Sequence, residues 1–283
     1  MVEISSILAG SLAGGCGILV GHPFDSLKVR VQIGKSLNLT KYDLHTVRQL
    51  YRGVLPPLLT TGTFSAISFS FYEGSKRFIY TWQHPLDSVK PNHQYSLNTI
   101  FWGGTLSGVC ISALTVPVGM IKLQLQVHSE AGIMACARDL YAKSGMRVFY
   151  RGYASAFILE SPGRGVYLWT YETVKRRLAQ EYANMDSFFI SICAGVCAGI
   201  FSWFVVYPAD VIKARMQSDA HRVRFTSTWH CIQQTWAEGG IKSLYRGLGY
   251  TLARAGPVAA SILPIYDLSK AYIDQELLGL EYQ

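Results

Sequence analysis

The sequence predicts an all-α membrane protein with six transmembrane helices, and three observations support this fold class. Only 16% of the 283 residues are charged, whereas an average soluble domain carries about a quarter. Several long stretches contain no charged residue at all, and one sequence pattern occurs three times. The low charge content argues against a disordered or fibrous protein and against an ordinary soluble enzyme.

Four stretches without Asp, Glu, Lys or Arg are long enough to cross a membrane as helices, since about 20 residues span roughly 30 Å of hydrocarbon. They are residues 4–24, 53–72, 91–121 and 187–209. Two further apolar segments contain charge, Glu160 and Arg164 at about 152–171 and Arg254 at about 247–266. Counting both gives six spans and places the two termini on the same side of the membrane.

The loops between the spans differ in charge. The loops after the first, third and fifth spans hold 17 basic and seven acidic residues, whereas the other two loops hold six basic and five acidic residues. We expect the basic loops to face the electrically negative compartment. Because the basic residues are divided among three loops, no nucleic-acid partner is expected.

Four motifs recur in three copies. Each copy begins with a helix of small residues and continues with a proline followed by charges; the prolines are Pro23, Pro117 and Pro208. A YRG tripeptide follows at 51–53, 150–152 and 245–247, and an acid–lysine motif at 72–76, 171–175 and 266–270. Each copy is a pair of helices that cannot bury its faces alone, so three copies are expected to close on one another. The repeats are expected at 1–90, 91–183 and 184–283.

With these motifs the chain resembles the mitochondrial carrier (solute carrier 25) family over essentially its whole length. The resemblance implies a threefold pseudo-symmetric barrel of six tilted helices in the inner mitochondrial membrane. A central site for a small-molecule solute would open alternately to each side, with the basic loops in the matrix. We expect a monomer without a cofactor or metal ion. Cardiolipin is the expected bound lipid, at the helix starts marked by Gly53, Gly152 and Gly247.

The family's matrix gate lies behind the three prolines, where kinked helices converge. Carried over to this chain, it consists of Asp25, Lys28, Lys122, Gln124, Asp210 and Lys213. The expected pairs are Asp25 with Lys122 and Asp210 with Lys28. The third pair needs an acid at position 119 to meet Lys213, but Gly119 stands there, so this ring of charges is incomplete.

The cytoplasmic gate of the family maps onto Glu73, Lys76, Glu172, Lys175, Asp267 and Lys270, and this second ring is complete. We therefore predict that the matrix gate is the weaker of the two. An acid introduced at position 119 should slow transport or trap the matrix-closed state.

Three ionisable residues lie inside predicted spans and away from the gates: Glu160, Arg164 and Arg254. A charge within the membrane costs about 3 kcal/mol or more, so function is the default hypothesis for each. Glu160 and Arg164 share one helix face, which continues to Tyr171 and Lys175 and is expected to face the lumen. A purely structural Glu160–Arg164 pair is the alternative. Arg254 has no local partner, which favours binding of a substrate anion.

Counting back from each acid–lysine motif places the family's substrate contact points at Thr60, at Leu159 with Glu160, and at Arg254. An acid at the second point, with RAGP at 254–257, is similar to the carnitine/acylcarnitine and basic amino acid carriers. Leu159 replaces the arginine usual there. Glu160 suits an ammonium or quaternary ammonium group, and Arg254 suits a carboxylate. Trp203 adds a cation–π contact or simply packs.

Two functions remain open. The first is transport of a small cationic or zwitterionic metabolite, such as carnitine, an acylcarnitine, a basic amino acid or a related quaternary amine, by antiport. The second is an adaptor or regulatory role with little transport. Glu160, Arg254 and the complete gate favour the first; Gly119 and the short first matrix loop at 34–50 favour the second. Motifs of common enzyme classes are missing, so catalysis is not expected.

Overall fold

The computed structural model describes residues 2–34, 48–83, 95–127, 132–182 and 185–273. The long helices are α1 (Val2–Gln32), α3 (Leu55–Gln83), α4 (Leu97–Val127), α8 (Ser187–Ser218) and α11 (Leu248–Tyr272). The fourth predicted span is divided into α6 (Tyr153–Glu160) and α7 (Pro162–Glu181). The regular structure of the described residues is helical, which confirms the predicted all-α class.

Short helices follow two of the long ones. They are α5 (Ile133–Ser144) with the 3-10 helix η1 (Met146–Tyr150), and α9 (Thr228–Gly239) with α10 (Ile241–Leu244). The predicted short loop of the first repeat falls mostly at 35–47, outside the described residues. By length and hydropathy alone, two of the described helical segments qualify as membrane spans, Leu97–Val127 and Phe189–Ser218.

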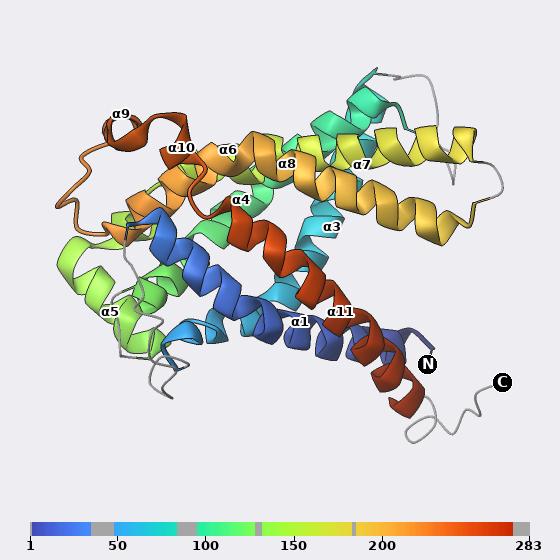
Figure 1. Cartoon of the computed structure of the whole chain (residues 1–283), viewed down its shortest axis with the longest axis horizontal. Helices are drawn as coiled ribbons and strands as arrows, with labels where there is room; N and C mark the ends of the chain where they lie inside the picture. Colours follow the sequence, from blue (N-terminus) through green and yellow to red (C-terminus); the bar gives the residue numbers. More distant parts are fainter. Residues whose placement is uncertain (1, 35–47, 84–94, 128–131, 183–184, 274–283) are drawn as a thin grey trace. The chain divides into compact units, whose positions relative to one another are not determined.

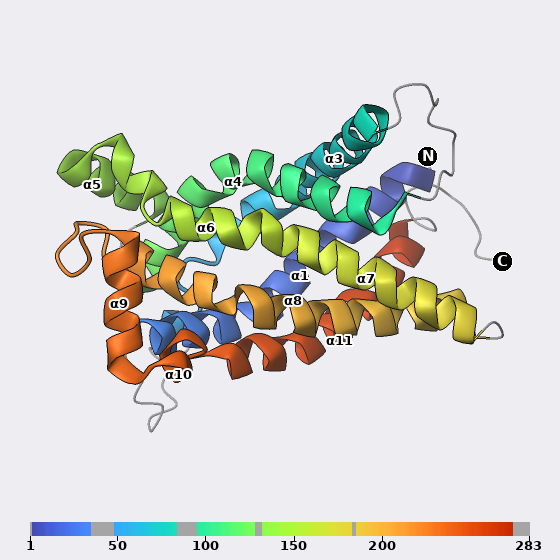
Figure 2. The same ribbon diagram turned by 90° about the horizontal axis from the view of Figure 1, so that it is seen from above.

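The structure divides into two compact units. The first comprises residues 1–63, 121–145 and 246–283, and the second comprises 64–120 and 146–245. In the first unit α1 packs along α11 (Figure 1). In the second unit α6 and α7 both pack on α8, and the long contact of α7 with α8 is visible in Figure 2. Helices from different sequence repeats therefore share a unit.

The three repeat prolines lie inside the long helices α1, α4 and α8, as predicted. A proline has no N–H group, so the carbonyl four residues earlier loses its helical donor. In two repeats a tyrosine hydroxyl replaces that donor. Tyr150 donates to the Ala113 carbonyl at 3.3 Å, four residues before Pro117. Tyr245 donates to the Phe204 carbonyl at 2.9 Å, four residues before Pro208.

The glycines of the YRG tripeptides occupy a backbone conformation that favours glycine. Gly53, Gly152 and Gly247 have φ angles of +76°, +75° and +89°. Space is also limited at two of these positions. A Cβ atom at Gly53 would lie 2.8 Å from the Lys122 carbonyl oxygen, and one at Gly152 would lie 3.0 Å from Met216 Cβ. Gly53 and Gly152 therefore let their turns approach the following motif helix closely.

The span predicted at about 152–171 contains a helix break at Ser161, which the sequence analysis did not predict. Pro162 cannot donate a backbone hydrogen bond and disfavours helical geometry at the residue before it. The Ser161 hydroxyl donates to the Thr105 carbonyl on α4 at 2.9 Å. A Cβ atom at Gly108 would overlap the Glu160 carbonyl oxygen, so α4 and the break are in close contact. The break places Glu160 at the end of α6.

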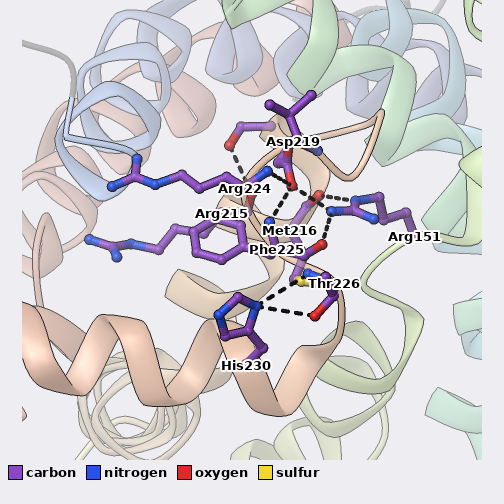
Figure 3. A network of polar contacts seen from close by, with 10 residues as sticks. Arg151, Arg215, Met216, Asp219, Arg224, Phe225, Thr226 and His230 are labelled. Atoms are coloured by element: carbon purple, nitrogen blue, oxygen red, sulfur yellow. Dashed lines mark hydrogen bonds and ion pairs between the residues drawn. The ribbon is translucent and has the colours of Figure 1, made fainter.

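A polar network ties the start of α6 to the loop after α8 (Figure 3). The Arg151 guanidinium lies 2.6 Å from the Asp219 carboxylate and donates to the carbonyls of Met216 and Phe225 at 2.9 and 2.7 Å. Asp219 also accepts hydrogen bonds from the backbone N–H groups of three loop residues, Val223, Arg224 and Phe225. The YRG arginine of the second repeat therefore holds a loop of the third.

Candidate substrate site and gates

Glu160 is at the centre of a charged cluster in the second unit. Its carboxylate lies 3.6 Å from Lys213 Nζ and 4.0 Å from Arg164 Nη2. Arg164 also donates a hydrogen bond to the Ser68 hydroxyl on α3. The Glu160–Arg164 pair considered in the sequence analysis is thus present, at the upper limit of an ion-pair distance. The Glu160 carboxylate is shared by two cations, Lys213 and Arg164.

A cavity of about 480 Å³ opens beside this cluster, a size suited to a small metabolite. Its polar lining includes Ser68, Glu160 and Arg164. Three aromatic side chains also line it, and they are Tyr72, Tyr167 and Trp203. The cavity therefore combines both signs of charge with π faces, which attract cations.

A second cluster of similar composition lies in the first unit. Asp25 of α1 contacts Lys122 of α4 at 3.3 Å, so the structure brings together this pair of the expected matrix gate. Asp25 also contacts Arg254 of α11 at 3.1 Å. Arg254 has no predicted partner nearby in the sequence, and the structure gives it a tertiary one. Its partner comes from a helix more than 200 residues away in the sequence, which local inspection could not reveal.

The third matrix-gate pair takes an unexpected form. Lys213 has no acid to meet at position 119 and pairs instead with Glu160, a predicted substrate contact. A Cβ atom at Gly119 would meet nothing within 4 Å, so the position has space for a side chain. Asp210 and Lys28 belong to different units, and their pairing stays a prediction. Gln124 is 6% exposed, in keeping with a role inside the helix bundle.

The cytoplasmic gate is partly described. Glu73 and Lys76 form an ion pair at 2.8 Å. Among the described side chains, Glu172 pairs with Arg176 at 2.8 Å rather than with a gate lysine, since Arg176 is one helical turn away. Lys175 lies 5.6 Å from the Tyr171 ring centre. The side chains of two predicted gate residues, Asp267 and Lys270, lie outside the described residues.

The remaining predicted contact points differ in their surroundings. Leu159 lines the cavity next to Glu160. Thr60 lies on α3 in the first unit, and its hydroxyl donates to the Pro56 carbonyl at 2.8 Å. Sequence reasoning missed several lining residues, among them Ser68, Tyr72 and Tyr167. Tyr167 lies on the helix face that runs from Arg164 to Tyr171, and Tyr72 and Ser68 lie one and two turns before Lys76. Helical spacing was therefore a usable signal for all three.

Comparison with known proteins identifies the family. Residues 3–82, 93–182 and 184–277 each match the model described as mitochondrial carrier protein. A mitochondrial basic amino acids transporter of Bos taurus is 32% identical over 293 residues, covering 97% of this chain and 94% of its own. A mitochondrial carnitine/acylcarnitine carrier protein of Mus musculus is 28% identical, with coverage of 95% and 94%. Mitochondrial magnesium exporter 1 of Drosophila melanogaster is 30% identical, with coverage of 92% and 91%. The chain therefore belongs to the mitochondrial carrier family and is a multi-pass transporter of the mitochondrial inner membrane.

Proposed function

We propose that this carrier transports a small cationic or zwitterionic metabolite by alternating access, in exchange for a second solute. The candidate class comprises basic amino acids, carnitine and acylcarnitines, and related quaternary amines. The observation that carries this proposal is the cavity in the second unit, where Glu160, Arg164 and three aromatic rings lie together.

Each wall of the cavity suits one part of such a solute. The Glu160 carboxylate attracts an ammonium or quaternary ammonium group. The Arg164 guanidinium suits a carboxylate, which it can bind through two parallel hydrogen bonds. A ring such as that of Trp203 contributes about 0.5–2 kcal/mol to binding of a cation. Arg254 and Thr60 stay predicted contacts from the sequence.

The relatives support this class of solute and extend the range to be tested. Those named as basic amino acids and carnitine/acylcarnitine carriers act on solutes with a cationic group. The relative named as a magnesium exporter has a similar identity, so an inorganic cation belongs among the tested solutes. We also propose that the carrier is a monomer with bound cardiolipin. The helix starts after Gly53, Gly152 and Gly247 present N–H groups that favour phosphate.

The test is uptake into proteoliposomes of labelled arginine, lysine, carnitine, choline and Mg²⁺. For the transported solute, Glu160→Gln should lower kcat/KM at least about tenfold, because the cationic group loses its counter-charge. The matched control is Asp139→Asn, which removes an acid from an exposed ion pair with Lys143 and should leave uptake unchanged.

Two results would contradict the proposal. One is full uptake of a cationic solute by the Glu160→Gln variant. The other is a folded wild-type protein that takes up none of these solutes, which would favour the adaptor or regulatory role. A cooperative thermal unfolding transition of the same preparation establishes that the protein is folded.

A further inference from the structure

Lys213 connects the matrix gate with the substrate cavity. It lies five residues after Pro208, in the proline motif of the third repeat. In the family pattern, the gate partner of this lysine is an acid at position 119 of the second repeat. Gly119 cannot provide this acid, and Lys213 Nζ instead lies 3.6 Å from the Glu160 carboxylate. Both side chains are largely shielded, at 16% and 23% exposure, so their attraction is only partly screened by water.

The charges around Glu160 do not leave it available to a solute. Its single negative charge faces Lys213 and Arg164, so an incoming ammonium group meets a carboxylate that two cations already neutralise. A solute cation gains the full attraction of Glu160 only if one of these residues moves away.

Lys213 is the easier of the two to displace. Arg164 has a second contact, the hydrogen bond to Ser68, and its guanidinium is planar and rigid. Lys213 is a point charge on a flexible four-carbon stem.

We propose that the cationic group of the solute and the Lys213 ammonium compete for Glu160, so that solute binding releases a lysine of the matrix gate. This inference rests on the proposed function. It makes Lys213 a specificity-determining residue. The cause is Gly119, since an acid at that position would pair with Lys213 and draw it away from Glu160. Solute binding at Glu160 and release of Lys213 from Glu160 are thermodynamically coupled. Any change that draws Lys213 away from Glu160 must therefore strengthen solute binding.

Affinity measurements on purified protein test this reciprocity, with choline and carnitine as probes. Lys213→Gln and Gly119→Asp should each lower the Kd of a bound probe about three- to tenfold, since both remove the competitor from Glu160. Gly119→Asn adds a side chain of the same size without charge and should leave Kd unchanged. Lys213→Arg keeps a competing cation whose planar guanidinium can bind the carboxylate through two hydrogen bonds, so it should raise Kd or at least not lower it. A Kd that stays the same or rises in Lys213→Gln would overturn the competition.

Lysine acetylation followed by mass spectrometry gives a readout independent of affinity. Choline and carnitine contain no primary amine and do not consume the reagent. Saturating probe should raise the acetylation rate of Lys213 at least about twofold in the wild type, as expected for a lysine released from an ion pair. Glu160→Gln should show the raised rate without probe, while Lys143, in its exposed pair, stays constant throughout.

The outcomes separate this inference from the proposed function. Probe binding to the wild type with an unchanged acetylation rate would overturn the competition and leave the proposed solute class standing. Failure of arginine, lysine, choline and carnitine to bind either the wild type or Lys213→Gln would overturn both. Raised affinity in Gly119→Asp together with slower uptake would support both, because the new acid would also strengthen the gate.

Discussion

Arg151 joins two segments that are 68 residues apart in the sequence. Its side chain is 4% exposed, and burial lowers the pKa of the guanidinium, which the neighbouring Asp219 carboxylate opposes. The carboxylate and two backbone carbonyls provide its partners. Buried charge is tolerated only with such complete pairing, so this network fixes the loop after α8 to the start of α6.

Asp219→Asn should destabilise the protein by about 3–5 kcal/mol, since it leaves the buried Arg151 charge without its counter-ion. The measurement is the Tm of the detergent-solubilised protein, which should fall by about 10 °C. Asp139→Asn is the control, because its pair with Lys143 is more than half exposed and contributes about 0–1 kcal/mol. Equal Tm values for the two variants would mean that the Arg151 network does not stabilise the fold.

At the scale of elements, the long helices depend on how each proline is accommodated. The prolines at 117 and 208 each leave one carbonyl without its helical donor, and a tyrosine from the YRG tripeptide donates to it. The first repeat differs. There Tyr51 stacks on His22 at a ring distance of 6.3 Å, and the His22 ring donates from Nε2 to the Arg52 carbonyl at 2.9 Å. The same tripeptide therefore anchors the motif helix by two different contacts.

Tyr245→Phe should lower stability by about 1–3 kcal/mol, because it leaves the Phe204 carbonyl unpaired and keeps the ring that packs on Tyr207. The matched control is Tyr51→Phe, which keeps the ring stacked on His22 and should change stability by less than about 0.5 kcal/mol. Thermal unfolding of the two variants beside the wild type measures the difference. A larger loss for Tyr51→Phe would contradict the proposed role of the Tyr245 hydroxyl.

The sequence was informative where the cause is local. Stretches without charge indicated the membrane spans, and recurring motifs indicated the repeats. Both signals can be read directly from the order of residues along the chain. The ion-pair partners of charged residues were harder to predict from the sequence than the spans and the repeats. Arg254 finds Asp25 on α1, and Lys213 finds Glu160 on α6, because tertiary packing decides which charges meet. The helix break at Ser161 had a local signal, Pro162, and was nevertheless missed because the apolar run continues across it.

At the scale of the whole molecule, each unit repeats one arrangement of charge. Asp25 is shared by Lys122 and Arg254 in the first unit, and Glu160 is shared by Arg164 and Lys213 in the second. In both clusters a predicted contact residue is bound by a gate residue of opposite charge. Within the second unit, a solute with one cationic and one anionic group has a complementary charge for Glu160 and for Arg164, which is why zwitterions belong in the proposed class.

The orientation of the chain in the membrane is the last prediction. The loops at 25–52, 122–151 and 210–246 carry 17 of the 26 Lys and Arg residues, so we expect them on the matrix side, which is electrically negative. Val223 lies in the third of these loops and is 88% exposed. Met185 lies between α7 and α8, on the opposite side by this prediction, and is 43% exposed. The two positions therefore report on the two compartments.

In mitoplasts, whose inner membrane is intact, a membrane-impermeant maleimide should label the Met185→Cys protein at once. It should label the Val223→Cys protein only after detergent opens the inner membrane. Labelling of the wild type under both conditions gives the background from its six native cysteines. The reverse pattern would place the basic loops outside the matrix. Most basic residues lie in the three loops that are expected on one side of the membrane. The reverse orientation would therefore require a force on the protein stronger than the effect of the membrane potential on these loops.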